Sequence, residues 1–223
     1  PDSDLPRARH TGAPVRREIR RVDRLVDRRA ARQRIGVDGD RFVVAVVGGS
    51  LGSSVLNEAV ARFVRESRHD SSLVVRHVVG ERFLAEVASR MNDVLTASGG
   101  IQYEVLGFDE SMRDVYAGAD VFVGRGGAGT VAEVATTGVP SILVPWSGAA
   151  DDHQTENVRW LSDRDAAILL TDDAVVEALG DVIRGLRVDE RRRDELGRRA
   201  FALGDLNRRG AVAELVDEVA ARG

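Results

Sequence analysis

The chain contains 223 residues, of which 43% are hydrophobic, enough to bury one core of ordinary size. Its formal net charge of −4 provides no net basic field, which argues against binding to nucleic acid. The absence of cysteine excludes disulfides and thiolate metal sites, and the longest apolar run, at 42–47, is far too short to cross a bilayer.

The first 41 residues are basic, with 12 Arg against seven Asp or Glu. Residues 17–34 predict a basic amphipathic helix whose apolar positions are Ile19, Val22, Leu25 and Val26. One interpretation places this helix against anionic lipid or phosphate. The other, which we favour, makes its basic side a solvated face.

From residue 42 onward, short apolar runs rich in Val and Ile alternate with helical patterns. The runs predict six strands, at 42–47, 73–79, 101–106, 120–123, 141–144 and 166–170. Apolar stripes predict helices at 56–64 and 83–95, and residues 173–222 predict two or three helices without a strand. This order indicates an α/β fold with a Rossmann-like, doubly wound, six-stranded parallel sheet. Because ligands bind beyond the carboxyl ends of such strands, the loops after the strands are the candidate sites.

A glycine-rich loop at 48–53 (GGSLGS) follows the first strand and leads into a helix. Glycines let backbone N–H groups approach a ligand, and a helix start attracts an anion, which suits a diphosphate. The alternative is a tight turn without a ligand. A dinucleotide fingerprint would need glycine at Val47, which argues against an NAD-dependent oxidoreductase, and no Gly-Lys-Ser/Thr follows to make a P-loop.

A second glycine-rich turn at 124–129 (GRGGAG) follows the fourth strand, with Thr130 and Glu133 after it. These two residues have the spacing of a capping box, which would make both structural. The functional interpretation has Glu133 accept two hydrogen bonds from a ribose diol, because a carboxylate is a bidentate acceptor. Two glycine-rich helix starts at neighbouring strand ends, one with an acid a turn in, favour a nucleotide site.

The loop after the fifth strand ends in the sequence DDHQTEN, which begins at Asp151. Either Asp151 or Asp152 can cap a helix whose polar first turn follows. Functionally, Gln154 and Asn157 share one helix face, and their amides carry donors and acceptors for sugar hydroxyls. His153 has no second His nearby and the adjacent carboxylates are not D-x-D, so no metal site is expected.

Together these segments resemble the MurG-type UDP-N-acetylglucosamine transferases of peptidoglycan synthesis, which have the GT-B fold and belong to glycosyltransferase family 28. The similarity covers nearly the whole chain from residue 11 onward. Residues 11–16 (TGAPVR) resemble the family's Gly-Asn-Pro-Val-Arg segment, and 48–52 resemble its Gly-Gly-Ser-Gln-Gly loop, with Leu51 in place of Gln. Residues 125–140 resemble its donor signature, and His153-Gln154-x-x-Asn157 matches its His-Gln-x-x-Asn motif.

The resemblance implies a site for UDP-N-acetylglucosamine as donor substrate, with no metal and no further cofactor. Gly49, Ser50 and Gly52 would face the diphosphate, with Arg16 nearby. The donor signature adds Arg125, Gly127 and Thr130 as substrate-binding positions. Phe108 would lie by the uracil, and the backbone at Asp109 would read the edge of that ring. Glu133 would hold the ribose, while Gln154 and Asn157 would contact the GlcNAc hydroxyls.

The resemblance also implies that this chain is the donor-binding half of an inverting transferase that converts lipid I to lipid II. Residues 1–16 would end the N-terminal domain, 17–205 would form the UDP-sugar-binding domain, and 206–223 would form a C-terminal helix. The lipid-linked acceptor, the catalytic base and membrane contact would belong to the N-terminal domain, so no catalytic residue is assigned here. The full-length protein would be cytoplasmic and peripheral to the inner face of the plasma membrane, and this chain alone would be inactive.

Two alternatives stay open. Leu51 and Gly126 depart from the family pattern, which allows a diverged UDP-sugar transferase with another acceptor. The chain starts at Pro1 rather than Met, so we expect either an excised piece of a longer protein or a non-catalytic half that works with a separate acceptor subunit.

Overall fold

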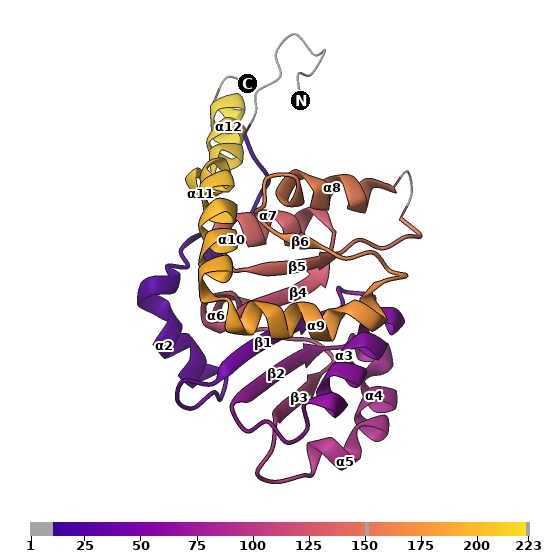
Figure 1. The fold of residues 1–223 in the computed structure, drawn as a ribbon. Helices are drawn as coiled ribbons and strands as arrows, with labels where there is room; N and C mark the ends of the chain where they lie inside the picture. Colours follow the sequence, from indigo (N-terminus) through magenta and orange to yellow (C-terminus); the bar gives the residue numbers. More distant parts are fainter. Residues whose placement is uncertain (1–10, 150–151, 222–223) are drawn as a thin grey trace.

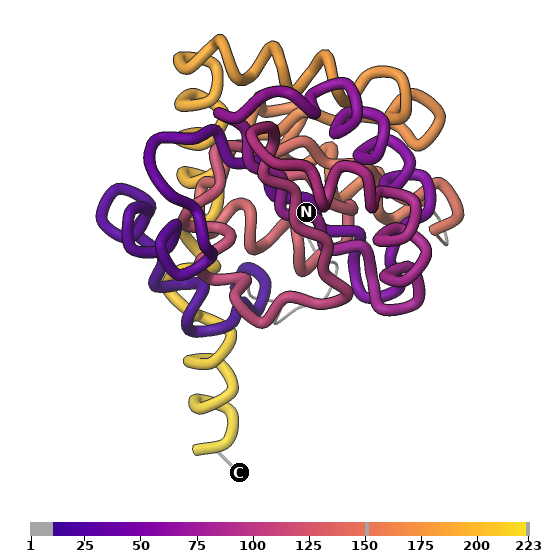
Figure 2. The backbone as a smooth tube through the Cα atoms, turned by 90° about the horizontal axis from the view of Figure 1, so that it is seen from below, coloured from indigo at the N-terminus to yellow at the C-terminus, as the bar shows by residue number. Residues whose placement is uncertain are grey.

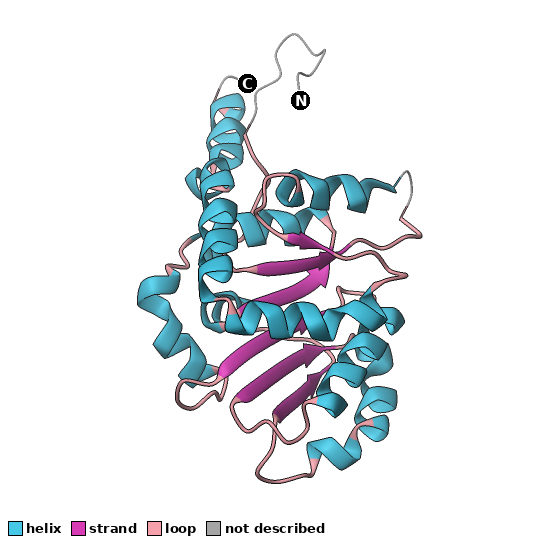
Figure 3. Cartoon of the chain, in the orientation of Figure 1, coloured by secondary structure: helices cyan, strands magenta, loops and turns pink. Residues whose placement is uncertain are grey.

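The computed structural model describes residues 11–149 and 152–221, which form a parallel sheet with helices on both faces (Figure 1, Figure 3). The strands are β1 (Phe42–Val47), β2 (Leu73–Val78), β3 (Gln102–Leu106), β4 (Val121–Arg125), β5 (Ser141–Val144) and β6 (Ile168–Leu169). Their order is β3-β2-β1-β4-β5-β6, and every pairing is parallel. This is the doubly wound Rossmann order with its switch point between β1 and β4, which confirms the predicted fold.

Helices cover the two faces of the sheet in separate groups. One face carries α3 (Ser54–Glu66), α4 (Leu84–Arg90), α5 (Asn92–Leu95) and α9 (Val175–Val188). The other carries α1 (Arg17–Arg20), α6 (Met112–Gly118), α7 (Ala128–Thr137) and α8 (His153–Ser162), with α2 (Arg24–Arg34) packed against α6. Along β1, Val44 and Val46 join the first core while Val43 and Ala45 join the second. Burial on both faces explains why the strands are continuous apolar runs.

The helical segments predicted after β1 are present, but two of them contain more helices than expected. Residues 83–95 contain α4 and α5 after a 3₁₀ turn at Glu81–Phe83. Residues 173–222 contain four helices rather than two or three, because α9 is followed by α10 (Glu190–Leu203), α11 (Asp205–Arg209) and α12 (Ala211–Ala220). Helix α12 has no buried residue and extends away from the body of the domain (Figure 2). Within the described ranges, no helix combines the length and the apolar character that crossing a membrane requires.

The predicted basic helix at 17–34 is two helices, α1 and α2, and the prediction for its apolar side is partly wrong. Ile19 and Val22 are buried as expected, but Leu25 is 97% exposed and Val26 is 75% exposed. The inward side of α2 instead carries three arginines spaced four residues apart, Arg24, Arg28 and Arg32. Other arginines of this segment, Arg17, Arg21 and Arg29, are exposed as a solvated face requires, so that prediction fails only for the inward side of α2.

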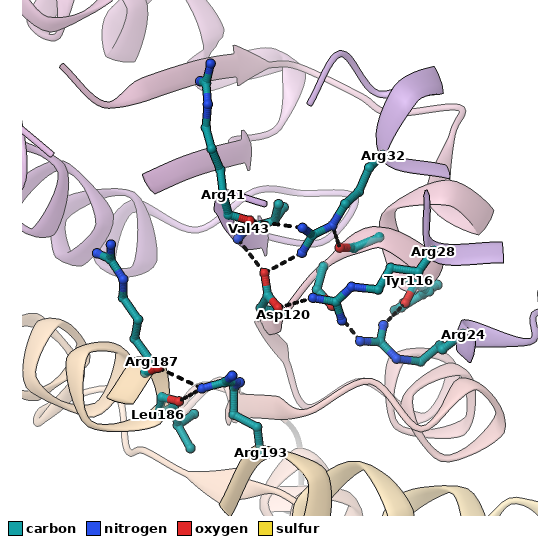
Figure 4. A network of polar contacts seen from close by, with 12 residues as sticks. Arg24, Arg28, Arg32, Arg41, Val43, Tyr116, Asp120, Leu186, Arg187 and Arg193 are labelled. Carbon is teal, nitrogen blue, oxygen red and sulfur yellow. Dashed lines mark hydrogen bonds and ion pairs between the residues drawn. The ribbon is translucent and has the colours of Figure 1, made fainter. Parts of the chain in front are cut away.

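The three arginines surround Asp120, a buried residue directly before β4 (Figure 4). Its carboxylate accepts hydrogen bonds from Arg28, from Arg32 at 2.5 Å and from the backbone N–H of Val43 at 2.7 Å. Arg24 donates instead to the carbonyl oxygens of residues 116 and 119, and burial lowers its pKa to about 9. One buried carboxylate therefore attaches α2 to the starts of β1 and β4.

A second buried polar group, His77 on β2, connects α3 to the sheet. Its Nε2 lies 3.1 Å from Asn57 Oδ1, and its Nδ1 lies 3.0 Å from the Tyr103 hydroxyl. Burial lowers the pKa of His77 to about 3, so the ring is neutral at pH 7 and carries one proton. Because the Asn57 amide donates to the carbonyl of Val79, its Oδ1 is the acceptor, which assigns the His77 proton to Nε2. The chain of hydrogen bonds holds the first turns of α3 against β2 and β3.

Candidate functional site

Loops with the predicted site residues meet along the carboxyl edge of the sheet (Figure 1). They follow β1 at 48–53, β3 at 107–111, β4 at 126–127 and β5 at 145–149. Strands β1 and β4 are hydrogen-bonded neighbours at the switch point, with Val47 paired to Gly124 at their ends. The two glycine-rich loops therefore lie side by side, where ligands bind in sheets of this kind.

The first glycine-rich loop is open around Gly49 and exposed at Ser50, whereas Gly52 packs against the β2 side of the sheet. Gly49 and Gly52 have φ values of 85° and 65°, which favour glycine, and the Gly52 N–H donates to the Gly49 carbonyl at 2.9 Å. Ser50 is exposed, and Ser53 caps α3 by accepting from Leu56 N at 3.1 Å. A helix start that follows an exposed glycine-rich turn is a suitable place for an anion, and the diphosphate contact itself stays a prediction.

The capping-box interpretation of the second glycine-rich loop is wrong. Helix α7 begins at Ala128 with Gly127 at its N-cap, so Thr130 lies inside the first turn and is not the capping residue. No side-chain hydrogen bond caps this described helix start. The spacing of Thr130 and Glu133 therefore has another explanation, and Glu133 has partners outside α7.

Glu133 is held by residues from two other elements. Its Oε2 accepts from the Tyr116 hydroxyl of α6 at 2.8 Å, and its Oε1 lies 3.7 Å from the guanidinium of Arg16. Burial, together with this carboxylate, raises the pKa of Tyr116 well above its usual value, so the hydroxyl keeps the proton that it donates. The predicted site omits Tyr116, which lies 17 positions from Glu133 and has no motif around it. Arg16 stands against Glu133 and also pairs with Glu18 at 3.5 Å.

Arg125, predicted to face the substrate, makes its hydrogen bonds to other groups of the protein. It donates to Ser53 Oγ and to Asp172 Oδ1, each at 2.5 Å, and to the carbonyl of Val144 at 3.3 Å. Its side chain is only 12% exposed. Arg125 therefore joins three segments of the carboxyl edge. Ser53 belongs to the predicted 48–53 loop, but its pairing with Arg125 was not predicted, and Asp172, 47 positions away, is absent from the predicted site.

Gln154 and Asn157, the predicted sugar-binding amides, lie on the first turns of α8 and each makes one contact with a neighbouring loop. Gln154 Oε1 accepts from the backbone N–H of Trp146 at 3.0 Å, and Asn157 Nδ2 donates to the carbonyl of Gly126 at 3.1 Å. An amide can make up to four hydrogen bonds, so both side chains retain capacity for a sugar. The structure thus brings these amides next to the donor signature.

The expected aspartate cap of α8 has a different form. Asp152 occupies the N-cap position with a φ of 52°, but its carboxylate accepts from the Thr155 hydroxyl at 2.6 Å and not from the helix backbone. Asp151, the other expected cap, lies outside the described residues. In the described part of the chain, no cluster of three or more His, Asp or Glu side chains is arranged to hold a metal ion.

Phe108 and Asp109 follow β3, the edge strand farthest from β4 on that side of the sheet. The Phe108 ring is 67% exposed, which leaves it accessible to a ligand. Asp109 is buried, and its carboxylate accepts from Arg76 Nε at 2.6 Å and from Ser111 N at 2.8 Å. The Asp109 side chain therefore shapes the loop, while contact of either residue with uracil stays a prediction.

A large groove of about 1510 Å³ lies at the opposite edge of the sheet, between α2, the start of β5 and α10. Its walls carry arginines and acids, including Asp120 and Arg28, which already pair with each other. None of the predicted donor residues lines it. We therefore place the candidate site at the carboxyl edge, where the two glycine-rich loops lie and where α7, the helix of Glu133, begins, because size alone does not identify a nucleotide site.

Two glycines of the first loop are expected to respond differently to replacement by alanine. A Cβ on Gly52 would lie 2.4 Å from the Val79 carbonyl and 2.7 Å from the Phe83 ring, whereas a Cβ on Gly49 would meet no atom within 4 Å. We expect Gly52→Ala to lower the unfolding temperature more than Gly49→Ala, although both positions have positive φ. Differential scanning calorimetry measures this difference, and equal losses would contradict the packing described here.

Residues 43–207 match the glycosyltransferase family 28 C-terminal domain. The UDP-N-acetylglucosamine--N-acetylmuramyl-(pentapeptide) pyrophosphoryl-undecaprenol N-acetylglucosamine transferase of Burkholderia mallei is 35% identical over 217 residues, covering 97% of this chain and 55% of that protein. The transferase of the same name from Xanthomonas oryzae pv. oryzae is 36% identical over 213 residues, covering 95% of this chain and 46% of its own length. This chain thus spans about half the length of the curated relatives that it matches.

Two solved structures are similar to this chain. MurG of Acinetobacter baumannii has a TM-score of 0.67 at 29% identity, covering 82% of this chain and 49% of that one. WaaG, a glycosyltransferase involved in lipopolysaccharide biosynthesis, has a TM-score of 0.62 at 16% identity, covering 90% of this chain and 54% of that one. This likeness shows the fold alone. The sheet order, the paired glycine-rich loops and the sequence match lead to one conclusion: the chain belongs to glycosyltransferase family 28 and corresponds to its C-terminal domain.

Proposed function

We propose that this chain is the UDP-N-acetylglucosamine-binding half of an inverting N-acetylglucosaminyltransferase of peptidoglycan synthesis. The names of the Burkholderia and Xanthomonas relatives support the donor and the undecaprenol-linked acceptor. The observation that carries the proposal is the position of Glu133. Glu133 lies in the second turn of α7, which follows the second glycine-rich loop, and its carboxylate accepts from Tyr116 of α6 rather than capping its own helix.

In the proposed mechanism, the chain orients the donor and stabilises the leaving group. The starts of α3 and α7 place positive helix-dipole ends beside the diphosphate, where charge builds as the glycosidic bond breaks. Glu133 accepts hydrogen bonds from the ribose hydroxyls, and Phe108 lies against the uracil. Gln154 and Asn157 contact the GlcNAc hydroxyls and thereby orient the anomeric carbon toward the acceptor.

The remaining parts of the reaction belong to a segment outside this chain. We propose that residues 17–205 form the donor domain, that 1–16 end a second, acceptor-binding domain, and that 206–223 form a C-terminal helix. That domain would supply the base and the lipid-linked acceptor, and catalysis would require closure of both domains over the donor. We place the full-length protein in the cytoplasm, at the inner face of the plasma membrane.

Binding of uridine nucleotides to the purified chain tests this proposal. We expect UDP and UDP-GlcNAc to raise the unfolding temperature, because a ligand that binds only the folded state stabilises it by about 2.7 kcal/mol at a hundred times its Kd. UDP-glucose should act more weakly than UDP-GlcNAc, and NAD should have no effect. A thermal-shift series without a response to any uridine nucleotide would remove the donor site.

A further inference from the structure

Asp172, in the loop between β6 and α9, joins two parts of the carboxyl edge that are far apart in the sequence. Its Oδ1 accepts from Arg125 at 2.5 Å, across 47 positions of the chain. Its Oδ2 accepts from both the backbone N–H of Ser147, at 3.0 Å, and the Ser147 hydroxyl, at 2.9 Å. The side chains of Asp172 and Arg125 are only 13% and 12% exposed, so the pair is largely shielded from solvent.

The segment that Asp172 holds is the loop at 145–149, between β5 and α8. Ser147 in this loop bonds Asp172, and the neighbouring Trp146 N–H donates to Oε1 of Gln154 at 3.0 Å. Asp172 therefore fixes one side of the loop, and Gln154 is attached to the other side. Any displacement of the loop moves the Trp146 N–H, the donor that holds the amide oxygen of Gln154.

We propose that Asp172 is a positioning residue that sets the sugar specificity of the donor site by fixing the 145–149 loop and, through it, Gln154. This inference rests on the proposed function, since it assumes that Gln154 reads the sugar. Although burial opposes it, hydrogen bonds from Ser147 and Arg125 keep the pKa of Asp172 below its usual value, so the carboxylate stays charged at pH 7.

Loss of the Asp172 carboxylate should affect binding of the sugar more than binding of the diphosphate, because Arg125 has a further hydrogen-bond partner in the 48–53 loop. Its second amino group donates to Ser53 Oγ, and Ser53 independently caps α3 through Leu56 N. Loss of the Asp172 carboxylate releases the Ser147 loop directly but leaves these contacts in place. Binding of UDP, which has no sugar beyond the ribose, should therefore change less than binding of UDP-GlcNAc.

The test compares Asp172→Asn with the unchanged chain by isothermal titration calorimetry, using UDP and UDP-GlcNAc. Asparagine keeps the size of the side chain but replaces one acceptor oxygen with an NH₂ group. That group cannot accept the hydrogen bond from Arg125 or from Ser147, whichever it faces. We expect about a tenfold loss of affinity for UDP-GlcNAc, which is roughly 1.4 kcal/mol, and less than about a threefold loss for UDP. The matched control is Asp173→Asn, the exposed neighbour that bonds Thr171, and both affinities should stay unchanged.

Ser147→Ala provides a second variant that removes one of the two bonds and leaves the backbone contact. It should weaken UDP-GlcNAc by about threefold, and combining it with Asp172→Asn should add little, because both act through the same loop. Equal losses for UDP and UDP-GlcNAc in Asp172→Asn, or full additivity in the double variant, would overturn the inference. The proposed function fails separately, if the unchanged chain binds neither nucleotide.

Discussion

Replacement of Asp120 by alanine is expected to lower the free energy of unfolding by about 3–5 kcal/mol, because it leaves the buried charge of Arg32 without its carboxylate. Arg32 is only 8% exposed, and Asp120 accepts from Arg32, from Arg28 and from the backbone N–H of Val43. The variant therefore loses two ion pairs and also leaves a buried N–H unsatisfied. The free energy of unfolding of a native domain is about 5–15 kcal/mol in total, so this one change removes a large share of the stability.

Urea denaturation followed by circular dichroism measures the effect. Asp120→Asn keeps an acceptor for Val43 but loses the charge, so its loss should be intermediate. The matched control is Glu177→Gln, which breaks an ion pair to Arg62 on an exposed surface, and we expect no resolvable change there. If Asp120→Ala and Glu177→Gln had equal effects, the arginine side of α2 would be a solvated face after all.

Replacement of Glu133 by alanine is expected to weaken UDP binding by about 1.5–3 kcal/mol, the value of hydrogen bonds to a charged group. This corresponds to roughly a ten- to hundredfold rise in Kd. The loss should be much smaller for 2′-deoxy-UDP, because that ligand lacks one of the two hydroxyls that the carboxylate would accept from. Calorimetric titration of both nucleotides into both proteins measures the difference.

Two control variants separate this role from a structural one. Tyr116→Phe keeps the Glu133 carboxylate but removes the hydroxyl that orients it, so UDP binding should weaken less than in Glu133→Ala. Thr130→Ala should leave the stability of α7 nearly unchanged, because Thr130 is not at its N-cap. Equal weakening of UDP and 2′-deoxy-UDP by Glu133→Ala would mean that the ribose is held by other residues.

Much of the fold could be predicted from local patterns. A parallel strand buried on both faces must be apolar along its whole length, so runs such as 42–47 and 141–144 identify strands. The glycine-rich loops could be placed at one edge of the sheet, because all parallel strands end at the same edge. The motifs in these loops also identified the family, which the match of residues 43–207 confirms, while contact of the loops with a nucleotide-sugar stays a prediction.

Pairings between distant residues could not be predicted in the same way. A hydrophobic pattern identifies the buried side of a helix only when the buried side chains are apolar. In α2 the buried side is charged, because Asp120 offers a partner 88 positions from Arg32, and Leu25 is left exposed instead. The capping-box spacing of Thr130 and Glu133 was similarly misleading, since α7 starts two residues before Thr130.

The amino-acid sequence by itself determined the alternation of strands and helices, the positions of the glycine-rich turns and the identity of the family, because each depends on residues close together in the chain. Only the tertiary structure decided which charges meet. The partners of Glu133, Arg125 and Asp120 come from other elements of the fold. Whether an arginine or a carboxylate faces a ligand, a core or solvent depends on the partner that packing brings within hydrogen-bond distance, and no local pattern records that distance.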